Sequence, residues 1–191
     1  MNIDIEVKNI SKIYENIKVL DNISYTFKAG TTTCIMGKSG IGKTTFINIL
    51  MGLEKADSGY VTPNIEYCAV FQENRLIEEL TPVNNILAVV DRSVKREVVI
   101  DNLLKLVDKE CLHKKVSMLS GGMKRRVTIV RAMLAKSQVV ILDEPFTGLD
   151  ETTKKVVIEY IKEMLAGRTL IVITHDEEDI RLLGADIFKI S

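Results

Sequence analysis

Residues 37–44 form a glycine-rich octapeptide, Gly-Lys-Ser-Gly-Ile-Gly-Lys-Thr, which limits the folds open to this chain more than any other segment. It follows a β-branched, apolar stretch at 31–36 that predicts a strand, and it precedes apolar residues at helical spacing in 46–53. Glycines let backbone N–H groups surround phosphate oxygens, and a helix N-terminus adds partial positive charge. The pattern G-x-x-x-x-G-K-[ST] in this context predicts a nucleotide phosphate site, with a plain glycine-rich turn as the alternative.

Two side chains of this loop have the chemistry to act on a bound triphosphate. The Lys43 ammonium would reach the β- and γ-phosphates, and the Thr44 hydroxyl would hold Mg²⁺. We expect the rest of the loop to bind the nucleotide as well. The expected nucleotide-binding residues are Gly37, Lys38, Ser39, Gly40, Ile41, Gly42, Lys43, Thr44 and Thr45.

An apolar run at 139–142 ends in the acidic pair Asp143-Glu144. Such a run is typical of a strand that is buried on both faces. An acid at the end of a strand of this kind holds Mg²⁺ in phosphate-loop enzymes, which is the role expected of Asp143. Glu144 would then orient or deprotonate the attacking water. The alternative is that Asp-Glu-Pro simply ends a strand and begins a turn.

A second glycine-containing segment, Ser-Gly-Gly at 120–122, precedes a predicted helix. It offers another potential anion site at a helix N-terminus, although Ser120 could equally be an ordinary N-cap. GTPases read guanine with Asn-Lys-x-Asp, and no asparagine of this chain is followed by lysine. The sequence therefore argues against a GTPase.

Strands alternate with helices along most of the chain, which predicts an α/β fold with a mostly parallel sheet. Residues 3–7 alternate apolar with charged side chains, which predicts a half-buried strand in an N-terminal antiparallel β subdomain. Other predicted strands are 19–27, 65–71, 138–142, 169–174 and 186–190; predicted helices are 80–116 for the most part, 154–165 and 177–183. Helix 154–165 shows an apolar stripe of Val156, Val157, Tyr160, Ile161, Met164 and Leu165. We expect a single domain, 1–191, with a helical subdomain at about 74–135 inserted in its α/β core.

Two further motifs follow the acidic pair: Thr-Gly-Leu-Asp at 147–150 and Thr-His-Asp at 174–176. Together with the earlier motifs they resemble the nucleotide-binding domain of an ATP-binding cassette (ABC) transporter over essentially the whole chain. The corresponding segments are 37–44 (Walker A), Gln72 (Q-loop), 119–123 (family signature), 139–144 (Walker B with its catalytic glutamate), 147–150 (D-loop) and His175 (switch histidine). The resemblance implies that this chain binds and hydrolyses ATP.

The resemblance also implies roles for residues whose types alone are ambiguous. Gln72 would touch Mg²⁺ or the lytic water, and His175 would contact the γ-phosphate; each could instead be a structural polar residue. Tyr14 would stack on adenine, or it could be a packing residue near a strand end. In a head-to-tail dimer, the signature residues of one subunit would close over the nucleotide of the other. The residues implied in contacts with the partner's nucleotide are Ser120, Gly121, Gly122 and Asp150.

Within the family, the motifs are most similar to those of the nitrate/sulfonate/taurine importer group. Met123 replaces the more usual Gln of the signature, and Lys124-Arg125-Arg126 is unusually basic. The sequence ends at a predicted strand, so we expect no C-terminal regulatory domain. His113 has no motif context and is expected at the surface.

Composition limits the possible partners. Lys plus Arg and Asp plus Glu are 26 each, so the chain lacks the basic excess of a nucleic-acid binder, and we expect no nucleic acid partner. No signal peptide and no apolar run of ~20 residues is present, so we expect a cytoplasmic protein at the inner face of the cell membrane, bound to transmembrane permease subunits. Three scattered cysteines predict reduced, packed thiols. The alternatives are a soluble ABC ATPase acting on nucleic acid or the ribosome, and a regulatory subunit without turnover.

Overall fold

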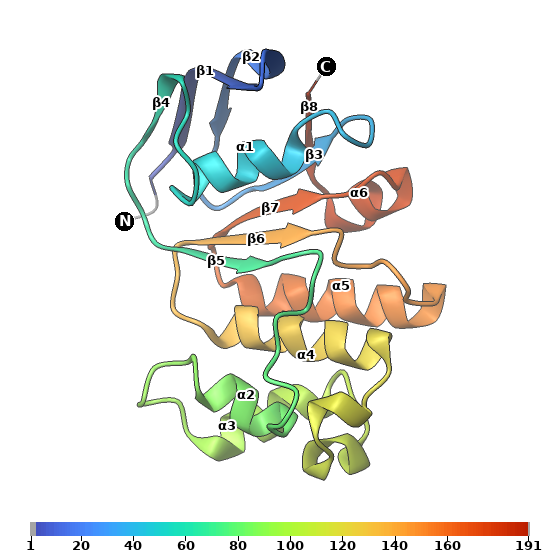
Figure 1. The fold of residues 1–191 in the computed structure, drawn as a ribbon. Helices are drawn as coiled ribbons and strands as arrows, with labels where there is room; N and C mark the ends of the chain where they lie inside the picture. The colour runs from blue at the N-terminus through green and yellow to red at the C-terminus, as the bar shows by residue number, and fades with distance from the viewer. Residues whose placement is uncertain (1–2, 191) are drawn as a thin grey trace.

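The computed structural model describes residues 3–190 and contains two sheets (Figure 1). The first sheet is antiparallel, with strand order β2-β1-β4. Its strands are β1 (Ile5–Tyr14), β2 (Ile17–Phe27) and β4 (Ser58–Thr62). Strands β1 and β2 form a hairpin whose two loop residues, Glu15 and Asn16, both have positive φ (46° and 73°), as a tight two-residue turn of the type I′ class requires.

The second sheet is parallel throughout, with strand order β5-β6-β7-β3-β8. Its strands are β3 (Thr32–Met36), β5 (Tyr67–Val70), β6 (Val139–Asp143), β7 (Thr169–Ile173) and β8 (Asp186–Lys189). The predicted fold class, an α/β core with a parallel sheet and an N-terminal antiparallel sheet, is confirmed. The predicted domain limits include residues 1, 2 and 191, which lie outside the described residues.

The helices form layers around the parallel sheet (Figure 1). Helix α1 lies between the two sheets, and helices α4 and α5 cover the opposite face, with α2 and α3 packed beyond α4. The α-helices are α1 (Lys43–Leu50), α2 (Pro82–Leu87), α3 (Arg96–Leu104), α4 (Gly121–Leu134), α5 (Glu151–Leu165) and α6 (Glu177–Leu183). Two short 3₁₀ turns lie between α3 and α4, at Lys109–His113 and Val116–Met118.

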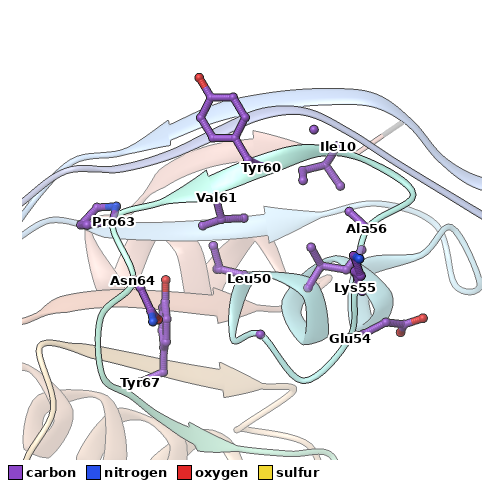
Figure 2. Close-up of a pocket in the computed structure, with 13 residues that line it drawn as sticks. Ile10, Leu50, Glu54, Lys55, Ala56, Tyr60, Val61, Pro63, Asn64 and Tyr67 are labelled. Carbon is purple, nitrogen blue, oxygen red and sulfur yellow. The ribbon is translucent and has the colours of Figure 1, made fainter.

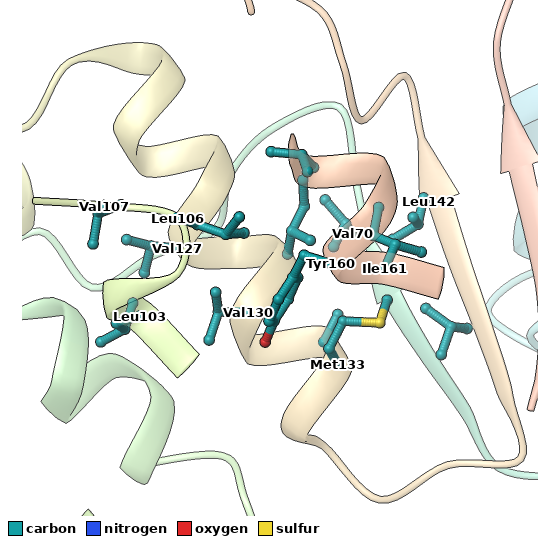
Figure 3. Close-up of a cluster of buried hydrophobic side chains, with 14 of the residues drawn as sticks. Val70, Leu103, Leu106, Val107, Val127, Val130, Met133, Leu142, Tyr160 and Ile161 are labelled. Atoms are coloured by element: carbon teal, nitrogen blue, oxygen red, sulfur yellow. The ribbon is translucent and has the colours of Figure 1, made fainter. Parts of the chain in front are cut away.

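Strand β6 separates two hydrophobic cores because its side chains alternate between the faces of the sheet. Val139 and Ile141 join the core under the antiparallel sheet and α1. Val140 and Leu142 join the core formed with α4 and α5, part of which Figure 3 shows around Tyr160. Every residue of β6 and β7 is buried, as predicted for strands with both faces covered.

Three predictions of local structure were inexact. Strand β4 was missed, because its sequence Ser-Gly-Tyr-Val-Thr lacks an apolar run and pairs only with β1. The predicted helical stretch 80–116 contains two short α-helices and a 3₁₀ turn, with loops between them. In α5, Val156 is 50% exposed whereas Ile158 is 1% exposed, because the buried face follows the i, i+3, i+4, i+7 spacing of Lys154, Val157, Ile158 and Ile161.

The three cysteines are free, and two of them, Cys34 and Cys111, are buried, as expected for packed thiols. Burial raises the pKa of the Cys34 thiol to about 12, which keeps it protonated and unreactive. His113 is exposed, as expected. Within residues 3–190, none of the helices combines the length and the apolar composition that crossing a bilayer demands.

Candidate active site

Motifs that lie far apart in sequence meet because the carboxyl ends of parallel strands share one edge of a sheet. Strand β3 leads into the glycine-rich loop, and β5 leads to Gln72. Strand β6 ends at Asp143 and is followed by Glu144, and β7 is followed by Thr174 and His175. The same edge therefore carries the predicted phosphate-binding, metal-binding and catalytic side chains.

A cleft of about 450 Å³ opens at this edge. It is lined by Tyr14, Val19, Ser39, Gly40, Gly42, Lys43, Thr44, Thr45, Gln72, Asp143, Glu144 and Ile173. Ten of these twelve residues were predicted as site residues. The fold therefore brings the glycine-rich loop, the acidic pair, Gln72 and Tyr14 together in one cleft. Val19 and Ile173 were not predicted, because apolar lining residues carry no motif.

The glycine-rich loop ends in a position that requires glycine. Gly42, immediately before α1, has a φ of 101°, and an added Cβ would lie 2.8 Å from Val19 Cγ1. The Lys43 ammonium folds back over the loop and donates to the carbonyls of Gly37 at 2.8 Å and Lys38 at 3.0 Å. The loop thus holds the Lys43 ammonium at the cleft. Phosphate oxygens of a bound nucleotide would replace the two carbonyls as its hydrogen-bond acceptors.

Asp143 carries a buried carboxylate whose charge a bound cation would stabilise. Asp143 is 7% exposed, and no donor within residues 3–190 forms a hydrogen bond to its carboxylate. Burial raises the pKa of this carboxyl and Glu144 raises it further, while Arg125 and Lys43 oppose them. The Thr44 hydroxyl and the Gln72 amide line the same cleft, and oxygen donors of these kinds suit Mg²⁺.

Glu144 has an unusual backbone for a glutamate, with a φ of 47°. Its N–H donates to the Ile173 carbonyl at 3.0 Å, which fixes this conformation between β6 and β7. The carboxylate lies 3.2 Å from Nδ1 of His175, whose side chain is largely exposed. A non-glycine residue in the left-handed region is strained, and such strain is concentrated at functional sites.

Tyr14 lies at the end of β1 beside the glycine-rich loop, at the rim of the cleft. Its hydroxyl donates to the Glu54 carboxylate, and this bond raises the pKa of Tyr14, so the phenol stays neutral. The Lys12 ammonium lies 5.2 Å from the ring centroid. The ring is 40% exposed, which leaves surface for a stacked partner.

The signature segment and Asp150 lie outside the lining of this cleft. Ser120 is the N-cap of α4, with its hydroxyl accepting from the Met123 N–H, and Asp150 caps α5 through the Thr153 N–H. The two caps are neighbours, since an added Cβ at Gly122 would lie 3.4 Å from the Leu149 side chain. Ser120 is therefore an N-cap in this subunit, and Gly121, the first residue of the helix, is exposed.

Two of the other hollows are lined in part by residues of the glycine-rich loop or by the partner of Tyr14. Gly37, Lys38, Ile41 and His175 line one that borders the end of β8. The other has a volume of about 290 Å³ and lies between β4 and the end of α1 (Figure 2). It shares no lining residue with the cleft, but Glu54, which accepts the hydrogen bond of Tyr14, also lines it.

Residues 20–147 match the protein-family model described as "ABC transporter". The chain belongs to this family. It is 35% identical over 199 residues to the bicarbonate transport ATP-binding protein CmpD of Synechococcus elongatus, covering 93% of this chain and 72% of the relative. It is 34% identical over 203 residues to the aliphatic sulfonates import ATP-binding protein SsuB of Bacillus subtilis, covering 98% and 79%.

A solved structure of the ABC cassette MJ0796, described as a dimeric post-hydrolysis state bound to ADP and Pi, has the same fold. Its TM-score is 0.86 at 28% identity, and the match covers 98% of this chain and 94% of that chain. The ABC family resemblance read from the motifs is thus confirmed. The chain is an ATP-binding and ATP-hydrolysing subunit of an ABC transporter.

Sequence reasoning missed two features of this ABC cassette. The first is Arg125, whose buried guanidinium contacts the backbone of the Gln72 loop. The second is Lys154, which is buried among acidic side chains beside the His175 loop. The basic run at 124–126 was a signal for Arg125, but nothing in the sequence indicates which groups it meets.

Proposed function

We propose that this chain is the ATPase subunit of an importer-type ABC transporter whose membrane-spanning permease lies on other polypeptides. The observation that carries the proposal is the cleft that joins Lys43, Asp143 and Glu144 with Gln72. The import proteins among its relatives favour uptake as the direction of transport. A catalytic glutamate and a neighbouring histidine at 3.2 Å favour turnover over a purely regulatory role.

The cleft residues suggest how the triphosphate is held. The loop N–H groups and Lys43 bind the phosphates, and Tyr14 stacks on the base. Thr44, Gln72 and Asp143 would hold Mg²⁺, which would neutralise charge on the β- and γ-phosphates when bound. Mg²⁺ usually keeps several waters and takes further ligands from substrate phosphates, so these few protein oxygens would be enough to hold it.

Glu144 is the proposed general base. It accepts a proton from water as the water oxygen attacks the γ-phosphorus and the bond to the β–γ bridging oxygen breaks, which releases ADP and phosphate. His175 positions the Glu144 carboxylate through Nδ1, and its other nitrogen remains available to the γ-phosphate. A base held in a strained backbone is already oriented before the substrate arrives.

The subunit is proposed to work as a head-to-tail homodimer. Ser120, Gly121, Gly122 and Asp150 lie apart from the cleft of their own chain, so they are available to the nucleotide of a partner. The N-terminus of α4, a helix of 14 residues, would add its partial positive charge to the anion held by Lys43 of the partner subunit. The dimeric relative is consistent with this arrangement.

The permease is proposed to dock on the inserted helical subdomain, about 74–135, near the Gln72 loop. Exposed apolar surface is typical of a partner-binding site, and five large apolar residues of this subdomain are exposed: Ile77, Val89, Val98, Leu104 and Met118. Docking of this kind would hold the subunit at the inner face of the cell membrane. ATP-driven closure of the dimer would then shift the permease between two conformations.

Affinity purification from solubilised membranes tests this function. We expect the tagged subunit to bring down a multi-span membrane protein and the complex to hydrolyse ATP faster than the free subunit. Recovery with ribosomes or DNA, and with no membrane protein, would overturn the transport assignment. The variant with Glu144 replaced by Gln serves as the inactive control.

A further inference from the structure

The basic run at the start of helix α4 contains a buried arginine that the proposed function leaves without a role. Arg125 is 6% exposed. Its Nη1 donates to the Phe71 carbonyl and its Nη2 to the Gln72 carbonyl, each at 2.6 Å. Both bonds go to backbone oxygens of the segment that carries Gln72 to the cleft.

Other cations of α4 hold the continuation of the same segment. Arg131 donates to the Arg75 carbonyl at 2.9 Å and to the Asn74 carbonyl at 3.4 Å. Lys124 pairs with the Glu78 carboxylate at 2.9 Å. Helix α4 therefore contacts the segment from Phe71 to Glu78 at successive points.

The segment is also folded on itself. The Arg75 guanidinium lies 3.6 Å from the centroid of the Phe71 ring, an arrangement that favours cation–π attraction. A loop that is closed internally and bonded to one helix is expected to shift with that helix as a unit.

The environment of Arg125 suits its guanidinium in particular. None of the ion pairs within residues 3–190 joins Arg125 to a carboxylate, and burial lowers the pKa of its guanidinium, while Asp143 and Glu144 oppose that effect. A planar fork can donate to two carbonyls at once, which a lysine ammonium on a flexible stem does less well. The contact thus requires both the charge and the shape of arginine.

We propose that Arg125 is a positioning residue for Gln72, because its two bonds to the Phe71 and Gln72 carbonyls make the Gln72 loop move with the helix that begins at Ser120. This proposal rests on the proposed roles of Gln72 and of the signature segment. Contact between the start of α4 and the partner's nucleotide then sets where Gln72 lies in the subunit's own cleft. Each subunit would thereby couple the two sites that it contacts.

Steady-state ATPase measurements on Arg125→Gln test the proposal. We expect kcat to fall by about 10- to 100-fold, because displacement of a positioned group by about 1 Å has this effect. KM for ATP should stay within about twofold, since Lys43 and the glycine-rich loop are unchanged. Arg125→Lys, which keeps the charge but not the fork, should be intermediate.

Arg168→Gln is the matched control. Arg168 also donates to backbone carbonyls, but to those of Met133 and Ala135 at the opposite end of α4 and to that of Met164 in α5. Its loss should lower the melting temperature without lowering kcat. An equal fall of kcat in both variants would show that Arg125 acts through stability alone and would overturn the proposal.

A double-mutant cycle with Gln72→Ala separates this inference from the function on which it rests. If Arg125 acts through Gln72, Arg125→Gln should lower kcat little further in the Gln72→Ala background. Full activity of Gln72→Ala alone would refute the role of Gln72, and with it the positioning role. The rate of amide hydrogen exchange of residues 71–75 should rise in Arg125→Gln. An unchanged rate would refute the claim that Arg125 fixes this loop, whatever the ATPase measurements show.

Discussion

Glu144 combines the two properties expected of a catalytic base: a fixed position and a hydrogen-bonded partner. Its backbone lies in the left-handed region and is tied to β7, and its carboxylate contacts His175. Burial and the neighbouring Glu144 raise the pKa of the Asp143 carboxyl, so a bound metal cation would favour its ionised form. The two adjacent acids therefore have different surroundings, as the different roles proposed for them require.

The first prediction concerns Glu144→Gln. The amide keeps the size of the side chain but cannot accept the proton, so we expect turnover to fall by about 10²- to 10⁴-fold while ATP affinity is retained. ATP should then accumulate in a closed dimer, detectable by size-exclusion chromatography. Glu159→Gln, an exposed acid on α5, should behave as the wild type. Undiminished hydrolysis by Glu144→Gln would exclude Glu144 as the base.

At the scale of elements, helices α5 and α6 are joined by a buried ion network beside the His175 loop. Lys154 is 5% exposed and its ammonium lies 2.8 Å from Asp176 and 3.1 Å from Asp179. Asp176 caps α6, and Asp179 accepts a hydrogen bond from Thr174 at 2.7 Å. The residues on both sides of His175 are therefore fixed through one lysine of α5.

The second prediction is that Lys154→Met lowers the free energy of unfolding by about 3 kcal/mol, because it leaves the Asp179 carboxylate buried without its cation. Lys162→Met is the control on the same helix. Lys162 pairs with Glu159 at the surface, so its loss should cost at most about 1 kcal/mol. Urea unfolding at neutral pH measures both. Equal losses would contradict the assignment of the buried network as the stabilising feature.

The same network gives a pH dependence with a defined sign. The bond from Lys154 lowers the pKa of Asp176 below its ordinary value of 3.8, so its contribution is present above that value and is lost as pH falls below it. The bond to Asp176 raises the pKa of Lys154 above 10.5, so that contribution is present below 10.5 and is lost only as pH rises well beyond it. The difference in stability between wild type and Lys154→Met should therefore be constant near neutral pH and shrink in acid below about pH 4.

The elements that the sequence predicts well are those whose pattern is local. The buried strands and the motifs at their ends follow from apolar runs and glycines, and this is why Lys43, Asp143 and Glu144 could be placed at one edge. The face of α5 was misjudged at Val156, because apolarity alone does not say which side meets the sheet. Contacts such as that of Arg125 depend on chain segments more than fifty residues apart, which no local pattern encodes.

At the scale of the whole molecule, the chain presents on separate surfaces the two features proposed to contact nucleotide. The cleft holds Lys43, and the start of α4 exposes Gly121 with nothing within 4 Å of an added Cβ. A complete site that needs both features requires two subunits in the head-to-tail arrangement, in which the same pair of surfaces meets twice.

The most direct test is complementation between two inactive variants. Lys43→Ala removes the phosphate-binding ammonium, and Gly121→Asp places a carboxylate against the partner's phosphate without a clash in its own subunit. Each variant alone should be inactive. Mixed in equal amounts, they should recover about one quarter of the wild-type ATPase rate, since half of the randomly formed dimers contain one intact site of two. A mixture as inactive as its components would contradict the shared site, and full activity of Gly121→Asp alone would show that the start of α4 does not face a nucleotide.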